Sequence, residues 1–220
     1  MKHATDQFAK FRQRMVSDQL RARGIRDPRV LAAMLAVPRE AFAPDASQGE
    51  VYADSPQPIG AGQTISQPFT VAYMAEAAEL RGAEKIFEVG TGSGYGAAVL
   101  SHLGAEVHTI ERLPALAERA TETLERLGYS RVHVHIGDGS LGLAEQAPFD
   151  AIVVTAGAGS LPPAYSEQLA EGGRIVIPIG RTERSQQLYR FRRNGNELSM
   201  SDLGAFAFVP LIGDAGWHSA

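Results

Sequence analysis

The feature that most constrains the fold is a regular alternation of two kinds of segment from residue 84 onward. Short apolar runs rich in β-branched residues recur at residues 85–89, 106–110, 131–136, 149–154 and 174–177. Stretches rich in Ala, Leu and Glu, with helical spacing, lie between several of them at residues 96–103, 114–127 and 163–169. Pro114 and Pro163 suit the first position of a helix, where a missing N–H costs nothing. Strands that alternate with helices imply right-handed crossovers and a parallel sheet covered on both faces.

The two ends of the chain follow other patterns. Residues 6–22 are spaced like a helix, and Asp27-Pro28 is a cap with a first-turn proline that opens a helix through Val37. Residues 43–67 are rich in Pro, Gly, Ser and Gln without a helical or strand period, which predicts a long loop that is functional or disordered. Two further strands, antiparallel to each other, are expected at residues 186–191 and 205–211.

These patterns predict an α/β fold with a doubly wound, mostly parallel sheet, an N-terminal helical cap and an antiparallel C-terminal strand pair. A chain of 220 residues is long enough to bury a sizeable core. We expect residues 1–220 to form one domain, with helices and a loop over residues 1–82 and the α/β core over residues 83–220.

Composition excludes several classes of partner and chemistry. The formal net charge of −4, from 21 basic and 25 acidic residues, argues against a partner with a phosphate backbone or an anionic membrane surface. The chain has no Cys, which excludes disulfides, thiolate nucleophiles and zinc–thiolate sites. It shows neither a secretory signal nor an apolar run long enough to span a membrane, so we expect a cytoplasmic protein. We also expect the protein to be a monomer.

A glycine-rich turn follows the strand at residues 85–89 and opens a helix. Gly90, Gly92 and Gly94 alternate there, and such glycines let the backbone approach a ligand closely. The structural alternative is a plain tight turn, for which three alternating glycines are more than is needed.

The ligand of this turn can be narrowed from its neighbours. When the motif is read from Gly92, residues 92–97 fit the G-x-G-x-x-A variant of a dinucleotide-binding motif. The pattern alone therefore does not exclude NAD as the ligand. An acidic residue two positions before the first glycine, Glu88, fits S-adenosylmethionine better. That cofactor has no pyrophosphate, and its amino-acid group carries an ammonium that a carboxylate can receive.

Two further acidic residues stand at the ends of the next two strands. Glu111 lies 21 residues after Gly90, the spacing at which an acid can accept both ribose hydroxyls, although it could instead pair with Arg112 in solvent. Asp138, between two glycines, could accept the adenine amino group or simply form a turn. Together with Glu88, they predict an adenosine site without phosphates.

Two other patterns carry less weight. His133 and His135 share one strand face, but no cysteine or carboxylate pattern accompanies them, so a packed or surface pair is favoured over a metal site. No G-x-S-x-G elbow is present for serine hydrolase chemistry.

Longer motifs resemble those of the protein-L-isoaspartate O-methyltransferase family, from about residue 15 to residue 217. The resemblance is carried by the glycine turn, by residues 37–42, 137–139, 147–156 and 208–211, and above all by residues 58–68, P-I-G-A-G-Q-T-I-S-Q-P. Many methyltransferases share the glycine motif, whereas the loop at residues 63–68 is specific to this family.

The resemblance implies a Rossmann-like methyltransferase that methylates the free α-carboxylate of L-isoaspartyl residues in damaged proteins and peptides. The methyl donor would be S-adenosyl-L-methionine, the product S-adenosyl-L-homocysteine, and no metal would take part; the ester then closes to a succinimide without help. Ser66 would be the active-site serine, beside the sulfonium methyl and the substrate carboxylate. The implied cofactor contacts are Thr64, Ile65, Ser66, Glu88, Gly90, Gly92, Gly94, Glu111, Asp138 and Gly139. The implied substrate contacts are Ile59, Gln63, Val209, Pro210 and Leu211.

The residues themselves are compatible with this chemistry. A free α-carboxyl has a pKa of about 3.3 to 3.7 and is ionised at neutral pH, so its attack on a methyl group needs no general base. Ser66 could orient one carboxylate oxygen, or could instead cap a helix that starts near Pro68. The chain departs from the family pattern at Gln57 and at residues 157–159, which bears on substrate preference. A methyltransferase for another carboxylate or small molecule, and a non-catalytic binding protein that kept the fold, remain alternatives.

Overall fold

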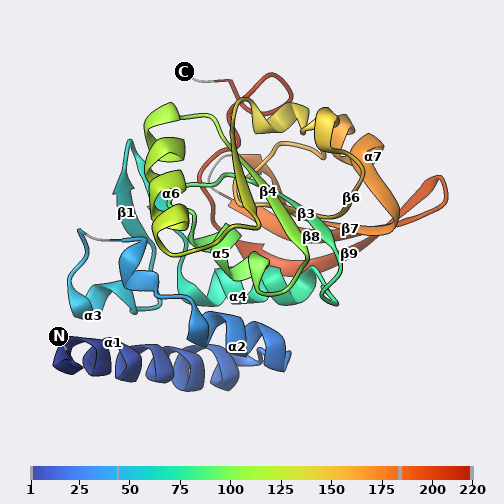
Figure 1. Ribbon diagram of the computed structural model, residues 1–220. Helices are drawn as coiled ribbons and strands as arrows, with labels where there is room; N and C mark the ends of the chain where they lie inside the picture. The colour runs from blue at the N-terminus through green and yellow to red at the C-terminus, as the bar shows by residue number, and fades with distance from the viewer. Residues whose placement is uncertain (1, 44, 183–184, 219–220) are drawn as a thin grey trace.

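A seven-stranded sheet forms the centre of the computed structural model, which describes residues 2–43, 45–182 and 185–218 (Figure 1). The strands stand in the order β5-β4-β3-β6-β7-β8-β9. Their bounds are β3 Lys85–Val89, β4 Glu106–Glu111, β5 Val132–Ile136, β6 Phe149–Val154, β7 Leu169–Thr182, β8 Ser185–Asn194 and β9 Glu197–Phe206. β3 to β7 pair in parallel, and β8 and β9 extend the sheet antiparallel to β7 and to each other. The predicted mostly parallel sheet with an antiparallel C-terminal pair is confirmed.

Helices lie on both faces of this sheet, as the alternation of segments predicted. They are α4 Pro68–Ala77, α5 Tyr95–Ser101, α6 Pro114–Arg126 and α7 Pro163–Gln168, with the short 3-10 helices η4 Gly139–Leu141 and η5 Ala144–Gln146. α4, α5 and α6 cover the face to which Ile86 and Val107 point, and these side chains are fully buried there. The opposite face, with Phe87 and Ile152, is covered by α7 and the segment that contains η4 and η5.

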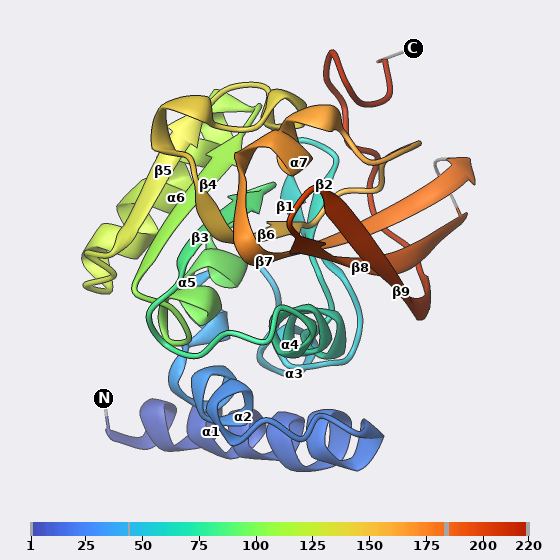
Figure 2. The same ribbon diagram turned by 90° about the vertical axis from the view of Figure 1, so that its right-hand side faces the viewer.

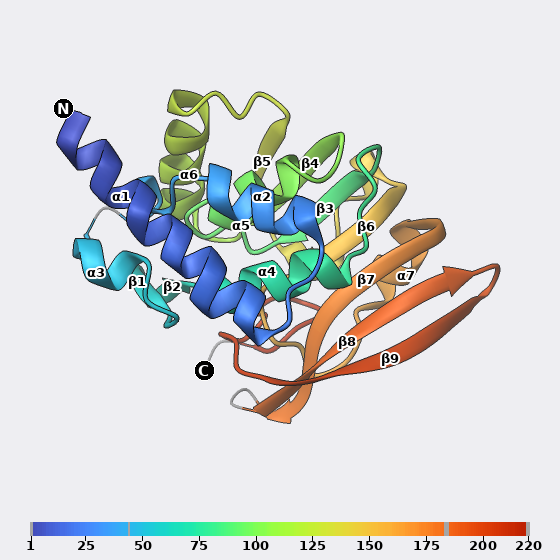
Figure 3. The same ribbon diagram turned by 90° about the horizontal axis from the view of Figure 1, so that it is seen from below.

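The N-terminal helices form a further layer outside α4 and α5 (Figures 2 and 3). They are α1 Lys2–Arg14, η1 Met15–Leu20, η2 Arg21–Arg23, α2 Pro28–Ala36 and η3 Arg39–Ala41. Asp27 is the N-cap of α2, and its side chain accepts a hydrogen bond from the backbone N–H of Arg29 at 2.8 Å. The helical cap expected from residues 6–22 and from Asp27-Pro28 is therefore present.

The expectation of a long loop without periodic structure at residues 43–67 is wrong. This segment contains α3 (Gln48–Val51) and an antiparallel hairpin of β1 (Gln57–Gly60) and β2 (Gln63–Ile65). α3 begins with a capping box between Ser47 and Glu50. The hairpin turns at Ala61 and Gly62, with φ of 51° and 71°, as a two-residue hairpin turn with positive φ at both positions requires. The elements were missed because each is shorter than a periodic pattern can reveal.

The last predicted strand, at residues 205–211, is also wrong in place. β9 runs from Glu197 to Phe206 and is an exposed edge strand, in which a short apolar alternation at Leu198 and Met200 stops at Asp202. Beyond Phe206 the chain leaves the sheet, and the Gln186 side chain accepts a hydrogen bond from the Phe208 N–H at 2.9 Å. Pro210 then forms only an isolated parallel bridge with Gly157.

The carboxyl ends of the parallel strands meet at one edge, and the C-terminal segment returns to it. Val89 of β3 is level with Ile110 of β4 and Val154 of β6. The Leu211 N–H donates to the Gly157 carbonyl at 2.8 Å, and Nε1 of Trp217 donates to the same oxygen at 3.0 Å. The backbone N–H of Trp217 donates to the Leu211 carbonyl at 2.7 Å. Three separate segments therefore converge where the strands end.

Candidate active site

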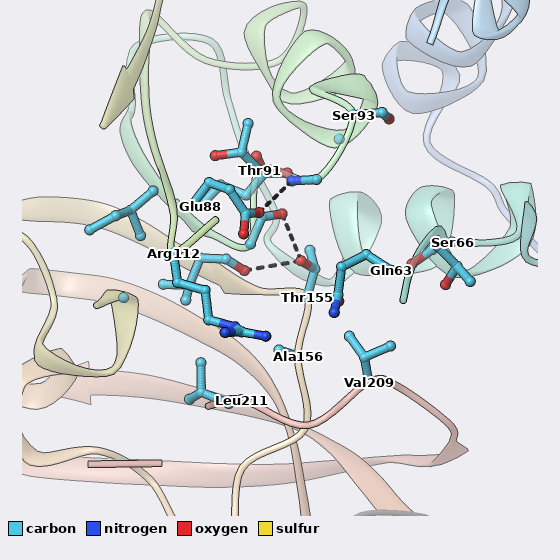
Figure 4. A pocket seen from close by; sticks show the side chains of 18 of the residues that line it. Gln63, Ser66, Glu88, Thr91, Ser93, Arg112, Thr155, Ala156, Val209 and Leu211 are labelled. Carbon is cyan, nitrogen blue, oxygen red and sulfur yellow. Dashed lines mark hydrogen bonds between the residues drawn. The ribbon is translucent and has the colours of Figure 1, made fainter. Parts of the chain in front are cut away.

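A cavity opens at this edge, between the ends of β3, β4 and β6 and the loop before α4 (Figure 4). Most of the residues predicted from the sequence line it: Gln63, Thr64, Ile65, Ser66, Glu88, Gly90, Gly92, Glu111, Gly139, Val209, Pro210 and Leu211. Ile59, Gly94 and Asp138 are not among its lining residues. The fold thus joins the hairpin loop, the glycine turn and the C-terminal segment in one site.

The glycine turn after β3 is shaped by tight contacts. Gly90, Gly92 and Gly94 have φ of 97°, 53° and 90°, which side chains rarely adopt. A Cβ on Gly90 would stand 2.4 Å from Oγ1 of Thr155, whose hydroxyl donates to the Gly90 carbonyl at 3.0 Å. Gly94 faces away from the cavity: it is the N-cap of α5, and a Cβ there would stand 3.1 Å from Leu124 of α6. Gly90 and Gly92 shape the cavity, whereas Gly94 allows two helices to pack.

Glu88 is the buried acid of the site. Its side chain is 1% exposed, and one carboxyl oxygen accepts a hydrogen bond from Oγ1 of Thr109 at 2.6 Å. A Cβ on residue 96 would stand 2.3 Å from the other oxygen, so Gly96 leaves the room that the acid occupies. Burial raises the pKa of Glu88 to about 8; the Thr109 hydrogen bond opposes this shift and the charge of Glu111 adds to it. Glu88 is therefore largely protonated at neutral pH, and a cation placed against it would favour the carboxylate.

Glu111 ends β4 with its carboxylate fixed at the cavity edge. One oxygen accepts from the backbone N–H of Gly92 at 2.9 Å and the other from that of Leu113 at 3.1 Å. The alternative ion pair with Arg112 is not formed in the described part of the chain. Each carboxylate oxygen keeps a further lone pair, so Glu111 can also accept hydrogen bonds from a ligand in the cavity.

Asp138 lies behind the cavity wall rather than in it. It is the N-cap of η4: its Oδ1 accepts from the N–H of Ser140 at 2.9 Å and from the Ser140 hydroxyl at 2.7 Å. Its Oδ2 accepts from the backbone N–H of Asp214 at 2.7 Å. Partial burial would raise the pKa of Asp138, but these hydrogen bonds hold it below its usual value. The neighbouring residue, Gly139, is the one that lines the cavity.

Ser66 lies in the loop between β2 and α4, at the wall of the cavity (Figure 4). The N-cap of α4 is Gln67, so the capping alternative for the Ser66 side chain is not formed. Among the described residues the Ser66 hydroxyl has no hydrogen-bond partner, whereas its backbone carbonyl accepts from Nη2 of Arg39 at 2.8 Å. The hydroxyl is therefore free to bind a ligand.

A groove begins on the other side of Ser66. It shares Thr64, Ser66, Thr155 and Val209 with the cavity. The rest of its lining mixes polar with apolar and aromatic side chains: Arg23, Pro56, Gln67, Phe69, Thr70, Ala205, Phe206, Ala207 and Phe208. The Arg23 guanidinium lies over the Phe69 ring, 3.7 Å from its centroid. Ser66 thus lines both the cavity and the groove.

Several residues that form or support the site were not identified from the sequence, among them Thr155, Tyr95 and Arg39. Thr155 follows β6 at the same edge as Gly90, and the shared edge of parallel strands was the signal that could have revealed it. Tyr95, the first residue of α5, also lines the cavity. Arg39 lies in the family motif at residues 37–42, but its full burial was not expected because arginine is almost always exposed.

Away from the cavity, His133 and His135 pack against a third histidine. Both rings stack on His108, with centroids 5.0 and 5.3 Å apart, and Nε2 of His135 lies 3.1 Å from Nδ1 of His108. Within the described residues no group of three or more His, Cys, Asp or Glu side chains is placed to hold a metal ion.

None of the helices among the described residues is long and apolar enough to cross a membrane.

A mostly parallel sheet with helices on both faces, a glycine turn after β3 and two acidic strand ends beside one cavity defines a Rossmann-like methyltransferase. The family model for protein-L-isoaspartate(D-aspartate) O-methyltransferase (PCMT) matches residues 11–216. The chain belongs to this family.

Individual relatives agree with the family match. The chain is 53% identical over 213 residues to protein-L-isoaspartate O-methyltransferase 1 of Rhodopseudomonas palustris, covering 96% of this chain and 87% of that protein. It is 53% identical over 216 residues to the protein of the same name from Geotalea uraniireducens, covering 98% and 99%. Among solved structures, a protein-L-isoaspartate O-methyltransferase aligns with a TM-score of 0.84 and 31% identity over 93% of this chain and 67% of that one. A beta-aspartate methyltransferase (PCMT) from Plasmodium falciparum, in complex with S-adenosyl-L-homocysteine, aligns with a TM-score of 0.77 and 27% identity over 90% and 96%.

Proposed function

We propose that this protein methylates the free α-carboxylate of L-isoaspartyl residues in damaged proteins and peptides, with S-adenosyl-L-methionine as methyl donor. The methyl ester then closes to a succinimide, which begins repair. The observation that carries the proposal is the place of Ser66, whose unbonded hydroxyl stands where the cavity and the groove meet. The relatives named above carry the same activity in their names.

The cavity residues fit a cofactor that combines adenosine with an amino acid. S-adenosyl-L-methionine supplies a methyl group on a sulfonium, and S-adenosyl-L-homocysteine is the product that leaves. We expect Glu88 to receive the ammonium group and Glu111 to accept the ribose hydroxyls, because both side chains line the cavity. Asp138 fixes η4 so that Gly139 faces the cavity, and a direct contact of Asp138 with the adenine amino group stays a prediction.

The groove fits the peptide side of the reaction. Its mixed polar and apolar lining, which includes Val209, can take the chain that flanks an isoaspartyl residue, while Gln63, Pro210 and Leu211 border the reacting end. The Ser66 hydroxyl donates to one carboxylate oxygen and leaves the other oxygen to attack the methyl carbon. An O–CH3 bond forms, an S–CH3 bond breaks and no proton moves. The chain therefore has to provide alignment and exclusion of water, not a base.

The direct test is methyl transfer from labelled S-adenosyl-L-methionine to a peptide that contains L-isoaspartate. The same peptide with normal aspartate is the control, because its free carboxylate stands on a side-chain methylene, whereas the free carboxylate of isoaspartate is attached directly to Cα. We expect label in base-labile ester on the isoaspartyl peptide alone. Equal transfer to both peptides, or transfer only to a small-molecule acid, would favour a methyltransferase of the same fold with another acceptor.

Absence of any turnover despite binding of the cofactor would instead favour a binding protein that does not catalyse methyl transfer.

A cytoplasmic location and a monomeric state stay predictions. Cell fractionation would check the location, and sedimentation would check the oligomeric state.

A further inference from the structure

Arg39, in the turn η3 after α2, is a buried arginine directly behind the Ser66 loop. Its side chain has 0% exposure. Nε donates to the Val51 carbonyl at 2.7 Å, and Nη2 donates to the Ser66 carbonyl at 2.8 Å. The guanidinium carbon lies 4.8 Å from the centroid of the Tyr95 ring. One planar group thus touches three segments that are far apart in the sequence.

The surroundings of Arg39 make it a costly residue for packing alone. Among the described residues no carboxylate forms an ion pair with it, and its Nη1 has no hydrogen-bond partner. A buried charge without a counter-charge is strongly destabilising, and an apolar side chain of similar volume often does as well or better. The forked guanidinium of Arg39 donates to two backbone carbonyls at once. Another side chain could not reproduce this pair of hydrogen bonds, whatever its charge.

Two of the three contacted segments line the site, and the third precedes the hairpin that leads into it. Ser66 carries the hydroxyl that we assign to the substrate carboxylate, and Val51 ends α3, beside the hairpin that leads into the Ser66 loop. Tyr95 follows the glycine turn and lines the cofactor cavity. Arg39 therefore connects the loop on the substrate side with the turn on the cofactor side.

We propose that Arg39 is a positioning residue, which holds the Ser66 backbone at a fixed distance from the glycine turn so that the Ser66 hydroxyl aligns the attacking carboxylate. This inference rests on the proposed function. Arg39 itself touches neither reactant; it acts through the Ser66 carbonyl and the Tyr95 ring. A misplacement of about 1 Å by a residue outside the reaction can lower a rate by about 100-fold.

The test compares Arg39→Lys with a matched control, Arg174→Lys. Arg174 is also a buried arginine that donates to backbone carbonyls, those of Ala78 and Glu79, at 2.8 and 2.6 Å, and it differs from Arg39 in its ion pair with Glu84 at 3.3 Å. It lies near the amino end of β6, where Arg174 is level with Ala151, away from the cavity. Lysine keeps the charge at either position but loses the fork. Rates on the isoaspartyl peptide are expressed per binding site for S-adenosyl-L-homocysteine, so that unfolded protein does not count.

For Arg39→Lys we expect kcat to fall by about 10- to 100-fold, with the Kd for S-adenosyl-L-homocysteine within about threefold of the parent. Arg174→Lys should lose melting temperature but keep kcat within about twofold. Because Arg39 is inferred to act through Ser66, adding Arg39→Lys to Ser66→Ala should slow the enzyme by less than about threefold further. A purely structural role would instead multiply the two effects.

Parental kcat in Arg39→Lys, or full multiplication in the double variant, would overturn the inference while leaving the proposed function standing. If the proposed function is wrong, the parent protein itself will not methylate the isoaspartyl peptide. Arg39→Met serves as a second variant if the lysine protein does not fold. Failure of both to fold would identify Arg39 as a residue of the folding core and would equally overturn its positioning role.

Discussion

The raised pKa of Glu88 predicts that the protein loses stability as the pH rises, and that Glu88→Gln removes this loss. An ordinary Glu has a pKa of 4.5, whereas Glu88 in the folded protein has a pKa of about 8. The folded state thus holds a proton that the unfolded state has released. The stability conferred by protonation is fully present below the unfolded value and is lost as the pH rises through about 8.

The magnitude follows from the interval between the two pKa values. Each pH unit inside it removes up to about 1.4 kcal/mol, and the loss levels off as Glu88 ionises. Between pH 6 and pH 8 the free energy of unfolding should therefore fall by about 2 kcal/mol because of this one group. Glutamine is neutral at both pH values and resembles the protonated acid in shape, and its amide oxygen can still accept from Thr109.

Urea unfolding of the parent and of Glu88→Gln at pH 6 and pH 8 would measure this difference. Other titrating groups change both proteins alike, so only the difference between them reports on Glu88. Glu125→Gln, an exposed substitution on α6, is the control for introducing an amide and should follow the parent. If the parent and Glu88→Gln lose stability in parallel between the two pH values, Glu88 is ionised in the folded protein and our account of its burial is wrong.

Three further substitutions test the site. Ser66→Ala should lower kcat by about 10- to 100-fold. The melting temperature and the cofactor affinity should not change, because the Ser66 hydroxyl has no hydrogen-bond partner among the described residues. A parental kcat on an isoaspartyl peptide would show that Ser66 takes no part in the reaction. Glu111→Gln should weaken binding of S-adenosyl-L-homocysteine by about 1.5 to 3 kcal/mol, since it loses a charge-assisted acceptor. Unchanged affinity in calorimetry would show that Glu111 only fixes the glycine turn. Asp138→Ala should cost about 1 kcal/mol of stability through the lost cap of η4. It should also reduce the preference for the adenine over the inosine form of S-adenosyl-L-homocysteine; an undiminished preference would make Asp138 a structural residue alone.

The parallel core and the cofactor half of the site could be predicted from the sequence because each signal is local. Buried strands appear as continuous apolar runs, and the glycine turn and Glu111 have a fixed spacing along the chain. The resemblance to the protein-L-isoaspartate O-methyltransferase family, based chiefly on residues 58–68, is confirmed by the family match. That residues 1–220 form one domain stays a prediction.

What the sequence did not reveal depends on contacts between distant segments. β9 has only a short apolar alternation, at Leu198 and Met200, and exists because β8 offers it a pairing edge. The hydrogen bonds that hold Asp138 come from Ser140 and from Asp214, which lies 76 residues further along the chain. The burial of Arg39 arises only when α2, α3 and the Ser66 loop come together. No local pattern contains that information.

The C-terminal segment that closes over the strand ends carries the chain's single tryptophan. The indole N–H of Trp217 donates a hydrogen bond to the Gly157 carbonyl. Its backbone N–H donates to the carbonyl of Leu211, which lines the cavity. Its fluorescence is therefore a built-in reporter of occupancy, since a ligand that presses on Leu211 changes the polarity and rigidity around the ring. Titration with S-adenosyl-L-homocysteine under tryptophan-selective excitation should shift or quench the emission in proportion to bound ligand. A flat emission at saturating ligand would show that this segment is mechanically isolated from the cavity. Its response would allow binding to be followed without a label, in the parent and in every variant proposed above.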